Sequence, residues 1–506
     1  MTETSRNADT MEAGDHRPAA PLDHAAALTI IIGIMLAMFL SALEQTIVAP
    51  ALATIGRSLA DVEHLSWVVT SYLLTATVAT PLFGKLSDIY GRRTMMLIAV
   101  SIFIAGSIAC ALAPTIGALI LGRALQGLGG GGILPLAQTV IADLLSPRER
   151  PVVQAYSSTM FMAACILGPV LGGVLTDYVH WSLIFWINVP LGALALFMTD
   201  RSLRKLPRNE RPHKLDFIGA GLMVAAALAL LLALSWGGVR YAWAGPEILG
   251  LLGGSVLLWG LFGWRLVRAP EPFLPLSMIR QPVVGMIVVA GFFGVGTIIG
   301  LSIFVPLYLE LVLGQSPSGA GLALIAFMVG ASSGSMFAGR AIARFDRYKR
   351  VPLVGLPVAI AVLIALAVEP AGHSLAGIAT LLAIGGAGLG PMYPMTTVVI
   401  QNAVKPHQLG TATGTLNFFR QLGGAIIVAT FAAIVLGGLD AGAGGLTLAK
   451  LTGGGAAADF AALFRFVFIA AVIFLSIALV AVLLIEERPL RGPARAPASS
   501  ARAAAE

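Results

Sequence analysis

The sequence predicts an all-α membrane protein with about fourteen spanning helices. Of its 506 residues, 57% are hydrophobic and 11% are charged, with a mean hydropathy of +0.89. Soluble domains carry about 25% charged residues, so a soluble or disordered chain is excluded. Apolar runs of about 18 or more residues recur between short charged loops. The runs do not alternate in polarity as barrel strands do, and in lipid only helices or closed barrels satisfy the backbone.

The apolar runs fall into three groups along the chain. A polar tail precedes the first run, which is too long to be a signal-peptide core. The runs lie near 25–49, 66–83, 95–113, 117–142, 152–176 and 183–200, then 215–236 and 247–264, then 283–311, 318–339, 351–368, 374–400, 411–437 and 460–485. We therefore predict a cytoplasmic tail at 1–24, a six-helix bundle at 25–200, two inserted helices with basic linkers at 201–282, a second six-helix bundle at 283–487 and a cytoplasmic tail at 488–506.

The distribution of basic residues predicts the orientation. Most of the 32 Lys and Arg residues lie in one set of alternate loops, while the opposite set holds Arg57, Arg240 and Lys450. Basic loops stay on the cytoplasmic side, so both termini are predicted to be cytoplasmic, in a multi-pass protein of the cell (cytoplasmic) membrane. The net charge of +7 does not indicate nucleic-acid binding, because no basic stripe interleaved with aromatic residues occurs outside these loops.

Several other classes of function lack their residues. No P-loop lysine follows the glycine run at 129–132, so no ATP site or other cofactor is expected. The membrane helices contain no His-rich metal cluster, and their few deep Ser and Thr residues lack a matching His and acid. The sequence therefore predicts neither an enzyme nor a bound metal.

A loop motif occurs in both six-helix groups. Residues 84–94 read GKLSDIYGRRT, and a weaker version, GRAIARFDRYK, occupies residues 339–349. The second copy has a displaced acid and lacks the second glycine. Two six-helix halves related by such a repeat are typical of transporters.

Four motifs resemble the major facilitator superfamily. The 84–94 loop resembles its signature between helices 2 and 3. Residues 43–48 (LEQTIV) resemble the first-helix signature of the 14-helix drug:proton antiporter branch, which commonly has Asp in place of Glu44. Residues 123–127 (RALQG) and 168–173 (GPVLGG) resemble its fourth-helix signature and the fifth-helix signature of antiporters. The resemblance covers residues 25–487 and implies the major facilitator fold, two six-helix bundles with two extra central helices.

Two intramembrane charges are the principal candidates for proton coupling. Glu44 and Arg123 each lie about 9 Å from the outer end of their helix, at 1.5 Å per residue. Charges at this depth are costly, so we expect the pair to meet across a central cavity. The resemblance implies proton or cationic-drug binding for Glu44 and proton relay for Arg123. The alternatives are a neutral acid that only fixes packing and an arginine held by helix-end carbonyls.

The 84–94 loop and the fifth-helix motif are candidate conformational elements. Asp88 is spaced to bridge Arg92 or to face a helix N-terminus, and Asp143 is a candidate charge partner. The resemblance implies a conformational switch at Gly84, Asp88, Gly91, Arg92 and Arg93. It also implies an antiporter hinge at Gly168, Pro169, Gly172 and Gly173. The alternatives are a basic loop that only fixes topology and glycines that only pack.

Polar and aromatic residues near the midplane are candidates for the substrate cavity. Arg420 is predicted to lie about 15 Å deep, either lining a cavity and contacting an anion or pairing with an acid. Glu310 is a second-half proton candidate, or a carboxylate at the rim of the bundle. Aromatic rings hold lipophilic cations by cation–π contact. The predicted cavity residues are Gln45, Gln126, Phe161, Phe304, Asn417 and Arg420.

The predicted function is proton-coupled multidrug export by alternating access. A monomer in the lipid bilayer exchanges protons for small lipophilic, cationic compounds, with no cofactor and no nucleic-acid partner. One alternative is an exporter of a lipid, a siderophore or an endogenous metabolite, because fold does not fix substrate. Another is a non-transporting receptor or scaffold, although a scaffold has no need for buried charges.

Overall fold

The computed structural model describes residues 24–61, 64–204, 216–238, 240–345, 347–441 and 456–487. Within these ranges, fourteen helices are long and apolar enough to cross a membrane, so the predicted fold class is confirmed. The two predicted tails, except His24, lie outside the described residues. So do 205–215 of the basic linker and the loop that contains Lys450.

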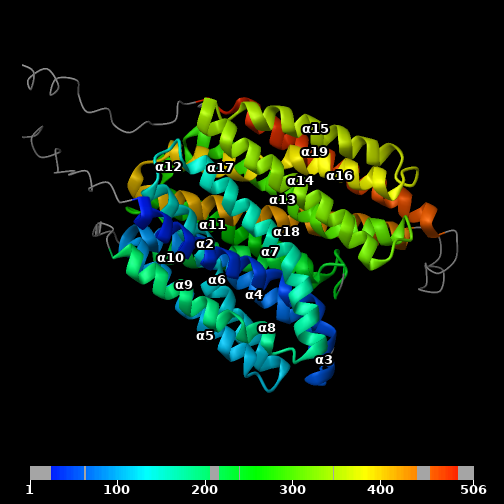
Figure 1. Cartoon of the computed structure of the whole chain (residues 1–506), viewed down its shortest axis with the longest axis horizontal. Helices are drawn as coiled ribbons and strands as arrows, with labels where there is room; N and C mark the ends of the chain where they lie inside the picture. Colours follow the sequence, from blue (N-terminus) through cyan, green and yellow to red (C-terminus); the bar gives the residue numbers. More distant parts are fainter. Residues whose placement is uncertain are drawn as a thin grey trace, which may run out of the picture.

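The N-terminal half, blue to green in Figure 1, contains six of these spans. Its sixth span is broken between α8 and α9, because Pro190 in the first turn of α9 has no N–H to bond the preceding turn. The elements are α2 (His24–Ile47), η1 (Ala49–Ala51), α3 (Leu52–Ser58), α4 (Leu65–Tyr90), α5 (Arg92–Ala111), α6 (Ile116–Leu144), α7 (Arg150–Tyr178), α8 (Leu183–Trp186) and α9 (Asn188–Leu203).

The C-terminal half also contains six spans. The sequence run 374–400 was expected to be one continuous helix, but it is broken at Gly390 and Pro391 into α16 and α17. A Cβ at Gly390 would lie 2.0 Å from the Ala331 carbonyl oxygen, so the break also brings α14 close. The elements are α13 (Pro282–Leu311), α14 (Pro317–Phe345), α15 (Arg350–Val368), α16 (Leu375–Leu389), α17 (Met392–Ala403), η2 (Pro406–Gln408), α18 (Leu409–Ala441) and α19 (Ala456–Leu484).

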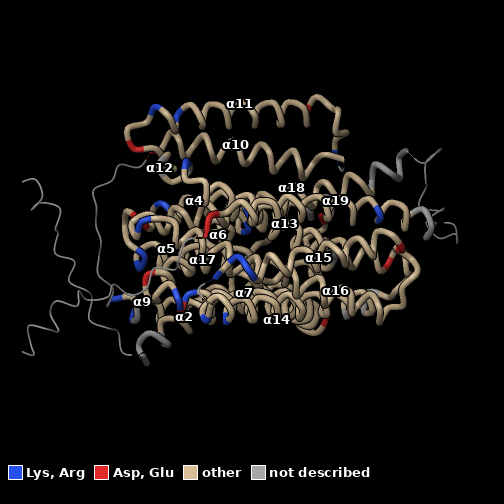
Figure 2. Tube along the Cα trace, turned by 90° about the horizontal axis from the view of Figure 1, so that it is seen from above, with Lys and Arg blue, Asp and Glu red and all other residues tan. Residues whose placement is uncertain are grey.

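The inserted helices are central in the sequence but lie on one flank of the bundle, with α11 outermost (Figure 2). They are α10 (Phe217–Trp236) and α11 (Pro246–Arg268), followed by the short α12 (Leu276–Ile279). Asp216 caps α10 by accepting from the Gly219 N–H at 3.0 Å, and Arg265 of α11 forms an ion pair with it at 3.1 Å. The pair α10 and α11 therefore packs as a hairpin, whose inner helix α10 contacts α4 and α18.

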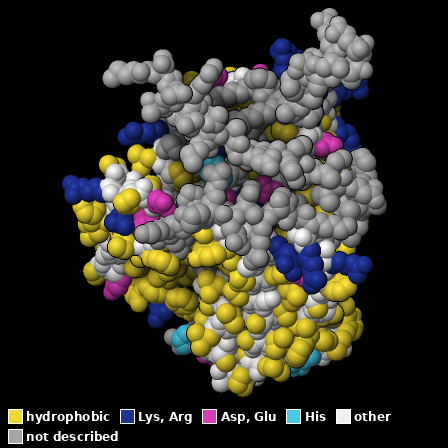
Figure 3. Space-filling model, turned by 90° about the vertical axis from the view of Figure 1, so that its left-hand side faces the viewer, with side chains coloured by type: hydrophobic (Ala, Val, Ile, Leu, Met, Phe, Trp, Pro, Cys, Tyr) yellow, Lys and Arg dark blue, Asp and Glu magenta, His cyan; other side chains and the backbone are white. Residues whose placement is uncertain are grey.

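One end of the bundle carries most of the described basic residues, and we call it the basic end (Figures 2 and 3). Near it the two halves meet through two glycine contacts. A Cβ at Gly84 on α4 would lie 2.5 Å from the Gly410 carbonyl oxygen on α18. A Cβ at Gly339 on α14 would lie 2.6 Å from the Pro151 carbonyl oxygen on α7. The glycine shared by the two loop motifs thus makes equivalent backbone contacts in both halves.

Replacing Gly84 by Val is expected to destabilise the protein, because the added side chain meets backbone that cannot move aside. Overpacking of this kind costs about 1–3 kcal/mol. Thermal unfolding of the purified protein measures the effect. Gly285→Val on α13 is the matched control, since no atom lies within 4 Å of a Cβ there. Equal unfolding temperatures for the two variants would contradict a close contact at Gly84.

Candidate functional site

Glu44 on α2 and Arg123 on α6 form an ion pair between the Glu44 Oε1 and the Arg123 Nη1. Both side chains are buried, with exposures of 0% and 1%. The predicted pairing is confirmed. An unpaired charge at this depth would be far more costly than the pair, which explains why both residues occur together.

The pair lies inside the N-terminal half, which corrects the expected position across a central cavity. Asn188 at the start of α9 donates to the Glu44 Oε2. Arg123 donates to the Gln126 Oε1 at 2.6 Å, and Gln126 donates to the Ser107 hydroxyl on α5 at 2.7 Å. Glu44, Ser107, Arg123, Gln126 and Asn188 are called the acid cluster below. Gln126 was predicted to line the substrate cavity, but its side chain is fully buried in this cluster.

Two further contacts fix the Arg123 guanidinium in the acid cluster. Its Nε donates to the Val68 carbonyl oxygen on α4 at 3.0 Å. The ring of Tyr72, also on α4, lies 4.3 Å from the guanidinium carbon, within cation–π range. The acid cluster and these contacts therefore join five helices of one half, α2, α4, α5, α6 and α9. Any change in the charge of Glu44 acts on all five.

Asn188 is the residue of the acid cluster that sequence reasoning missed. The sequence did contain a signal for this residue, because Asn188 is an amide inside an apolar run, two residues before Pro190. Pro190 breaks the span, and Asn188 becomes the first residue of α9. The Asn188 Oδ1 has no hydrogen-bond partner among the described residues. It is therefore available to accept a hydrogen bond from a protonated Glu44 after a flip of the amide.

Asp88 connects the two halves at the basic end. Its Oδ1 accepts from the Gly410 N–H at 3.0 Å, and its Oδ2 accepts from the Thr411 N–H at 2.7 Å and the Thr411 hydroxyl at 2.6 Å. These N–H groups belong to the first turn of α18, where free donors and the helix dipole favour an anion. Both predicted partners of Asp88 are present, since Arg92 also forms an ion pair with it at 2.6 Å.

The basic residues of the loop have separate acidic partners. Arg92 also pairs with Asp143 at the end of α6, at 2.9 Å, as predicted. Arg93 pairs with Asp200 of α9 at 2.5 Å and remains 42% exposed, so it lies at the surface of the N-terminal half. Gly91 separates α4 from α5 with a φ of +87°, a conformation that favours glycine. We call Asp88, Arg92, Asp143 and the first turn of α18 the basic-end clamp.

The fifth-helix glycines hold α7 against the helix that carries Glu44. A Cβ at Gly168 would lie 1.9 Å from the Thr46 hydroxyl oxygen, and one at Gly172 would lie 2.1 Å from the Ile47 carbonyl oxygen. Gly173 has no atom within 4 Å of its Cβ position, and Pro169 is exposed. Gly168 and Gly172 are thus contact residues, while a hinge at these four positions stays a prediction.

Arg420 on α18 is buried, and its hydrogen-bond acceptors among the described residues are neutral. Its Nη1 donates to the Asn417 Oδ1 at 3.2 Å, and its Nη2 donates to the Tyr393 carbonyl oxygen at 3.0 Å and to the hydroxyls of Thr396 and Thr397 on α17. In the described part of the chain no carboxylate pairs with it. The predicted alternative of a paired acid therefore finds no support in these residues.

The other predicted cavity residues lie apart from each other. Phe161 on α7 stacks on Tyr393 of the opposite half, with ring centroids 6.3 Å apart. Phe304 is buried in the C-terminal half, where its ring packs on Phe431. Gln45 is exposed and bonds the Ser41 carbonyl oxygen, outside the acid cluster. Glu310 is the penultimate residue of α13 and is exposed, as expected for a carboxylate at the rim of the bundle.

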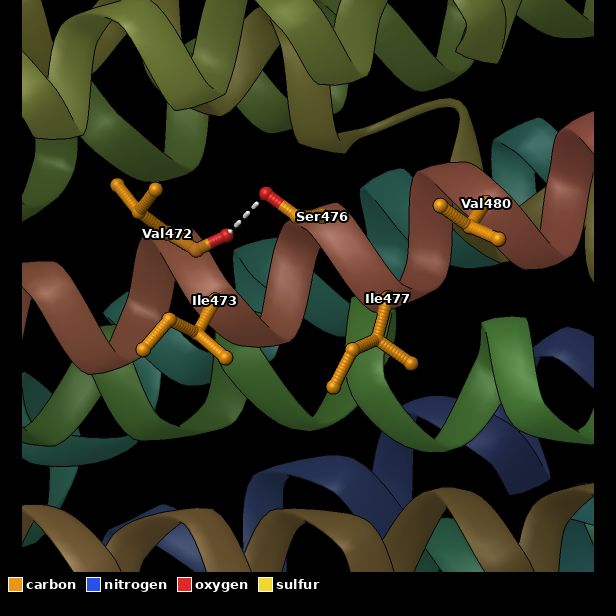
Figure 4. A pocket seen from close by; sticks show the side chains of 5 residues that line it. All are labelled: Val472, Ile473, Ser476, Ile477 and Val480. Carbon is orange, nitrogen blue, oxygen red and sulfur yellow. Dashed lines mark hydrogen bonds between the residues drawn. The ribbon is translucent and has the colours of Figure 1, made fainter.

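A depression elsewhere on the surface has no residues suited to this chemistry. It lies along α19 and is lined by Val472, Ile473, Ser476, Ile477 and Val480, with the Ser476 hydroxyl bonded to the Val472 carbonyl oxygen (Figure 4). Among the described residues, no group of three His, Cys, Asp or Glu side chains is placed to hold a metal ion. The charged groups of the candidate site are therefore those of the acid cluster, the basic-end clamp and Arg420.

Two six-helix halves with the Glu44–Arg123 ion pair buried among membrane-spanning helices define a polytopic transporter rather than an enzyme. Residues 34–428 match the Major Facilitator Superfamily, and the chain belongs to this family. Multidrug resistance protein 3 of Bacillus subtilis (strain 168) is 32% identical over 407 residues, which cover 80% of this chain and 79% of that protein. The multidrug transporter protein MdtP of the same organism is 32% identical over 425 residues, 83% of this chain and 77% of that protein.

Two further comparisons concern length and fold. An uncharacterised MFS-type transporter of Mycobacterium tuberculosis (strain ATCC 25618 / H37Rv) is 35% identical over 416 residues, and the chain spans 60% of its length. The proton:xylose symporter XylE has a TM-score of 0.62 at 14% identity, over 92% of this chain and 98% of that one. The likeness to XylE establishes the fold.

Proposed function

We propose that the protein is a drug:proton antiporter that exports small lipophilic, cationic compounds by alternating access. The observation that carries this proposal is the acid cluster, in which a fully buried carboxylate is held by Arg123 and Asn188. The names of the two Bacillus relatives, a multidrug resistance protein and a multidrug transporter, support the substrate class. In this proposal the basic end and both termini face the cytoplasm, as the positive-inside rule favours, and the protein acts in the bilayer as a monomer.

Protonation of Glu44 supplies the coupling in this proposal. A neutral Glu44 loses its attraction to Arg123, and the helices that share the acid cluster repack. The change passes from α2 to α7 through Gly168 and Gly172, and α7 contacts α14 of the other half, where the Ser332 hydroxyl donates to Thr159 at 2.9 Å. The basic-end clamp then opens and exposes the substrate path to the cytoplasm.

The test uses the full chain reconstituted in liposomes with an imposed pH gradient and the fluorescent lipophilic cation rhodamine 6G. Wild type is expected to move the dye against the proton flow, and an ionophore that collapses the gradient should stop the movement. Glu44→Gln should lose the gradient-driven component, because an amide cannot bind and release a proton. Glu310→Gln is the matched control, since that carboxylate is exposed at the end of a helix.

Three outcomes are informative. Loss in Glu44→Gln with retention in Glu310→Gln supports coupling through the acid cluster. An unchanged response of Glu44→Gln to the gradient would overturn it. If folded wild type moves no cation, a lipid, siderophore or metabolite exporter becomes the better proposal, and the same assay with neutral and anionic compounds decides.

A further inference from the structure

The guanidinium of Arg420 is a buried cation with unused hydrogen-bonding capacity. Its side chain is 2% exposed, and its Nε donates to no atom of the described residues. The groups that do accept from it are a carbonyl, two hydroxyls and an amide, all of them neutral. Burying a charge with only neutral partners is costly, so such residues in membrane helices are usually functional.

The buried arginines of the two halves differ in their partners. Arg123 has the carboxylate of Glu44, while Arg420 has none among the described residues. Gly291 on α13 packs against the Arg420 side chain, since a Cβ there would lie 3.7 Å from Nε. The Thr396 and Thr397 hydroxyls on α17 accept from Nη2 and themselves donate to backbone carbonyl oxygens of the same helix. The Nε–H is therefore a charged donor that no acceptor among the described residues uses.

Arg420 also lies beside the contact between the two halves. The Tyr393 ring covers its guanidinium, with the guanidinium carbon 4.5 Å from the ring centroid. Phe161 of the N-terminal half stacks on the same ring. Asn417, which accepts from Arg420, donates to the Gln138 Oε1 of α6 at 2.7 Å. When the halves separate, both neighbours lose a partner, and the guanidinium becomes reachable from the interface.

We propose that the Arg420 guanidinium, held in place by Thr396 and Thr397, binds the carboxylate of a lipophilic substrate through its free Nε–H, and that Tyr393 covers this site when it is empty. The proposal rests on the proposed function and narrows its substrate class to amphiphiles that carry an acidic group beside their aromatic or cationic part. Guanidinium–carboxylate bonds are the charge-assisted kind, short and strong. The Phe161 and Tyr393 rings provide an adjoining face for the aromatic part of the compound.

Two dyes with the same ring system test the proposal by equilibrium binding. Rhodamine 19 carries a free carboxylate, and rhodamine 6G is its ethyl ester. Fluorescence anisotropy with the purified full chain, at neutral pH and without a gradient, gives the ratio of the two affinities. Wild type should prefer the acid, and Arg420→Gln should weaken acid binding by about 10- to 100-fold while leaving the ester nearly unchanged. Arg420→Lys should restore part of the preference.

The variants separate recognition from folding. Thr397→Val removes one acceptor that orients the Arg420 Nη2, at nearly constant volume, and should lower the acid preference by a smaller factor. An equal loss of both dyes in Arg420→Gln, or an acid preference that survives it, would overturn the proposal. Both affinities are measured at equilibrium without a pH gradient, so failed proton coupling does not mask the result.

A small inorganic anion is the competing occupant with the same chemistry. Replacing chloride by isethionate, which carries no carboxylate, at constant ionic strength separates the two sources. If chloride raises the unfolding temperature of wild type but not of Arg420→Gln, while neither protein distinguishes the two dyes, the site takes only inorganic anions and the substrate proposal is wrong. If the acid preference is present in both salts and is lost in Arg420→Gln, the substrate carboxylate is the ligand.

Discussion

Replacing Arg123 by Met is expected to destabilise the protein by about 3–5 kcal/mol, because it leaves the Glu44 carboxylate buried without its counter-ion. The Glu44 and Arg123 side chains are 0% and 1% exposed, so water cannot compensate for the lost charge. The remaining Asn188 contact supplies one neutral donor to the carboxylate. Denaturant or thermal unfolding of the purified protein measures the loss.

A double-mutant cycle with Glu44→Gln separates the ion pair from the volume change. Glu44→Gln/Arg123→Met removes both charges, so it should be more stable than Arg123→Met alone. Arg420→Met is a comparison in the other half, where no carboxylate among the described residues is left unpaired. Additive effects of the Glu44 and Arg123 substitutions would contradict a direct energetic coupling between these side chains.

Asp88→Asn is expected to open the basic end. The carboxylate accepts three hydrogen bonds from the first turn of α18 and one from Arg92, and the amide keeps the size but not the charge. Charge-assisted hydrogen bonds contribute about 1.5–3 kcal/mol, so the ratio of closed to open molecules should fall by about 10- to 100-fold. The first turn of α18 also loses an anion that its dipole stabilises.

Distances between spin labels at Tyr90 and Lys405 report this opening, since both side chains are exposed near the clamp on opposite halves. The labels require prior replacement of Cys110 and Cys165. Asp200→Asn is the matched control, because Asp200 pairs with Arg93 and Arg204 of its own half. A longer distance in Asp88→Asn but not in Asp200→Asn is the expected result. Unchanged distances in folded Asp88→Asn would show that the clamp does not hold the basic end closed.

The acid cluster and the basic-end clamp differ in which halves of the protein they connect. The acid cluster is internal to the N-terminal half, whereas the basic-end clamp joins the halves through Asp88. Protonation of Glu44 therefore affects the clamp only by shifting helices, since among the described residues Glu44 bonds only to side chains of the N-terminal half. This separation favours indirect competition between proton and substrate over a shared binding position.

Much of the fold followed from the sequence, because lipid imposes simple rules. The fourteen spans were visible as apolar runs, and their number agrees with the structure. Two spans were predicted as continuous but contain breaks at Pro190 and Pro391, where proline removes a backbone hydrogen bond. The hydropathy runs alone did not reveal these breaks, since each apolar run continues on both sides of its proline. Both breaks place polar groups at the candidate sites, Asn188 at one and the Tyr393 carbonyl at the other.

The sequence by itself determined the class of protein, the number of spans and the pairing of Glu44 with Arg123. Charge is costly in hydrocarbon, so apolar runs and isolated charges within them can be recognised from the sequence alone. Only the tertiary structure decided that the pair is enclosed by Asn188, Ser107 and Gln126, and that Arg420 has neutral partners. Those contacts join helices far apart in the chain, and their geometry depends on glycine approaches and helix breaks that hydropathy does not encode.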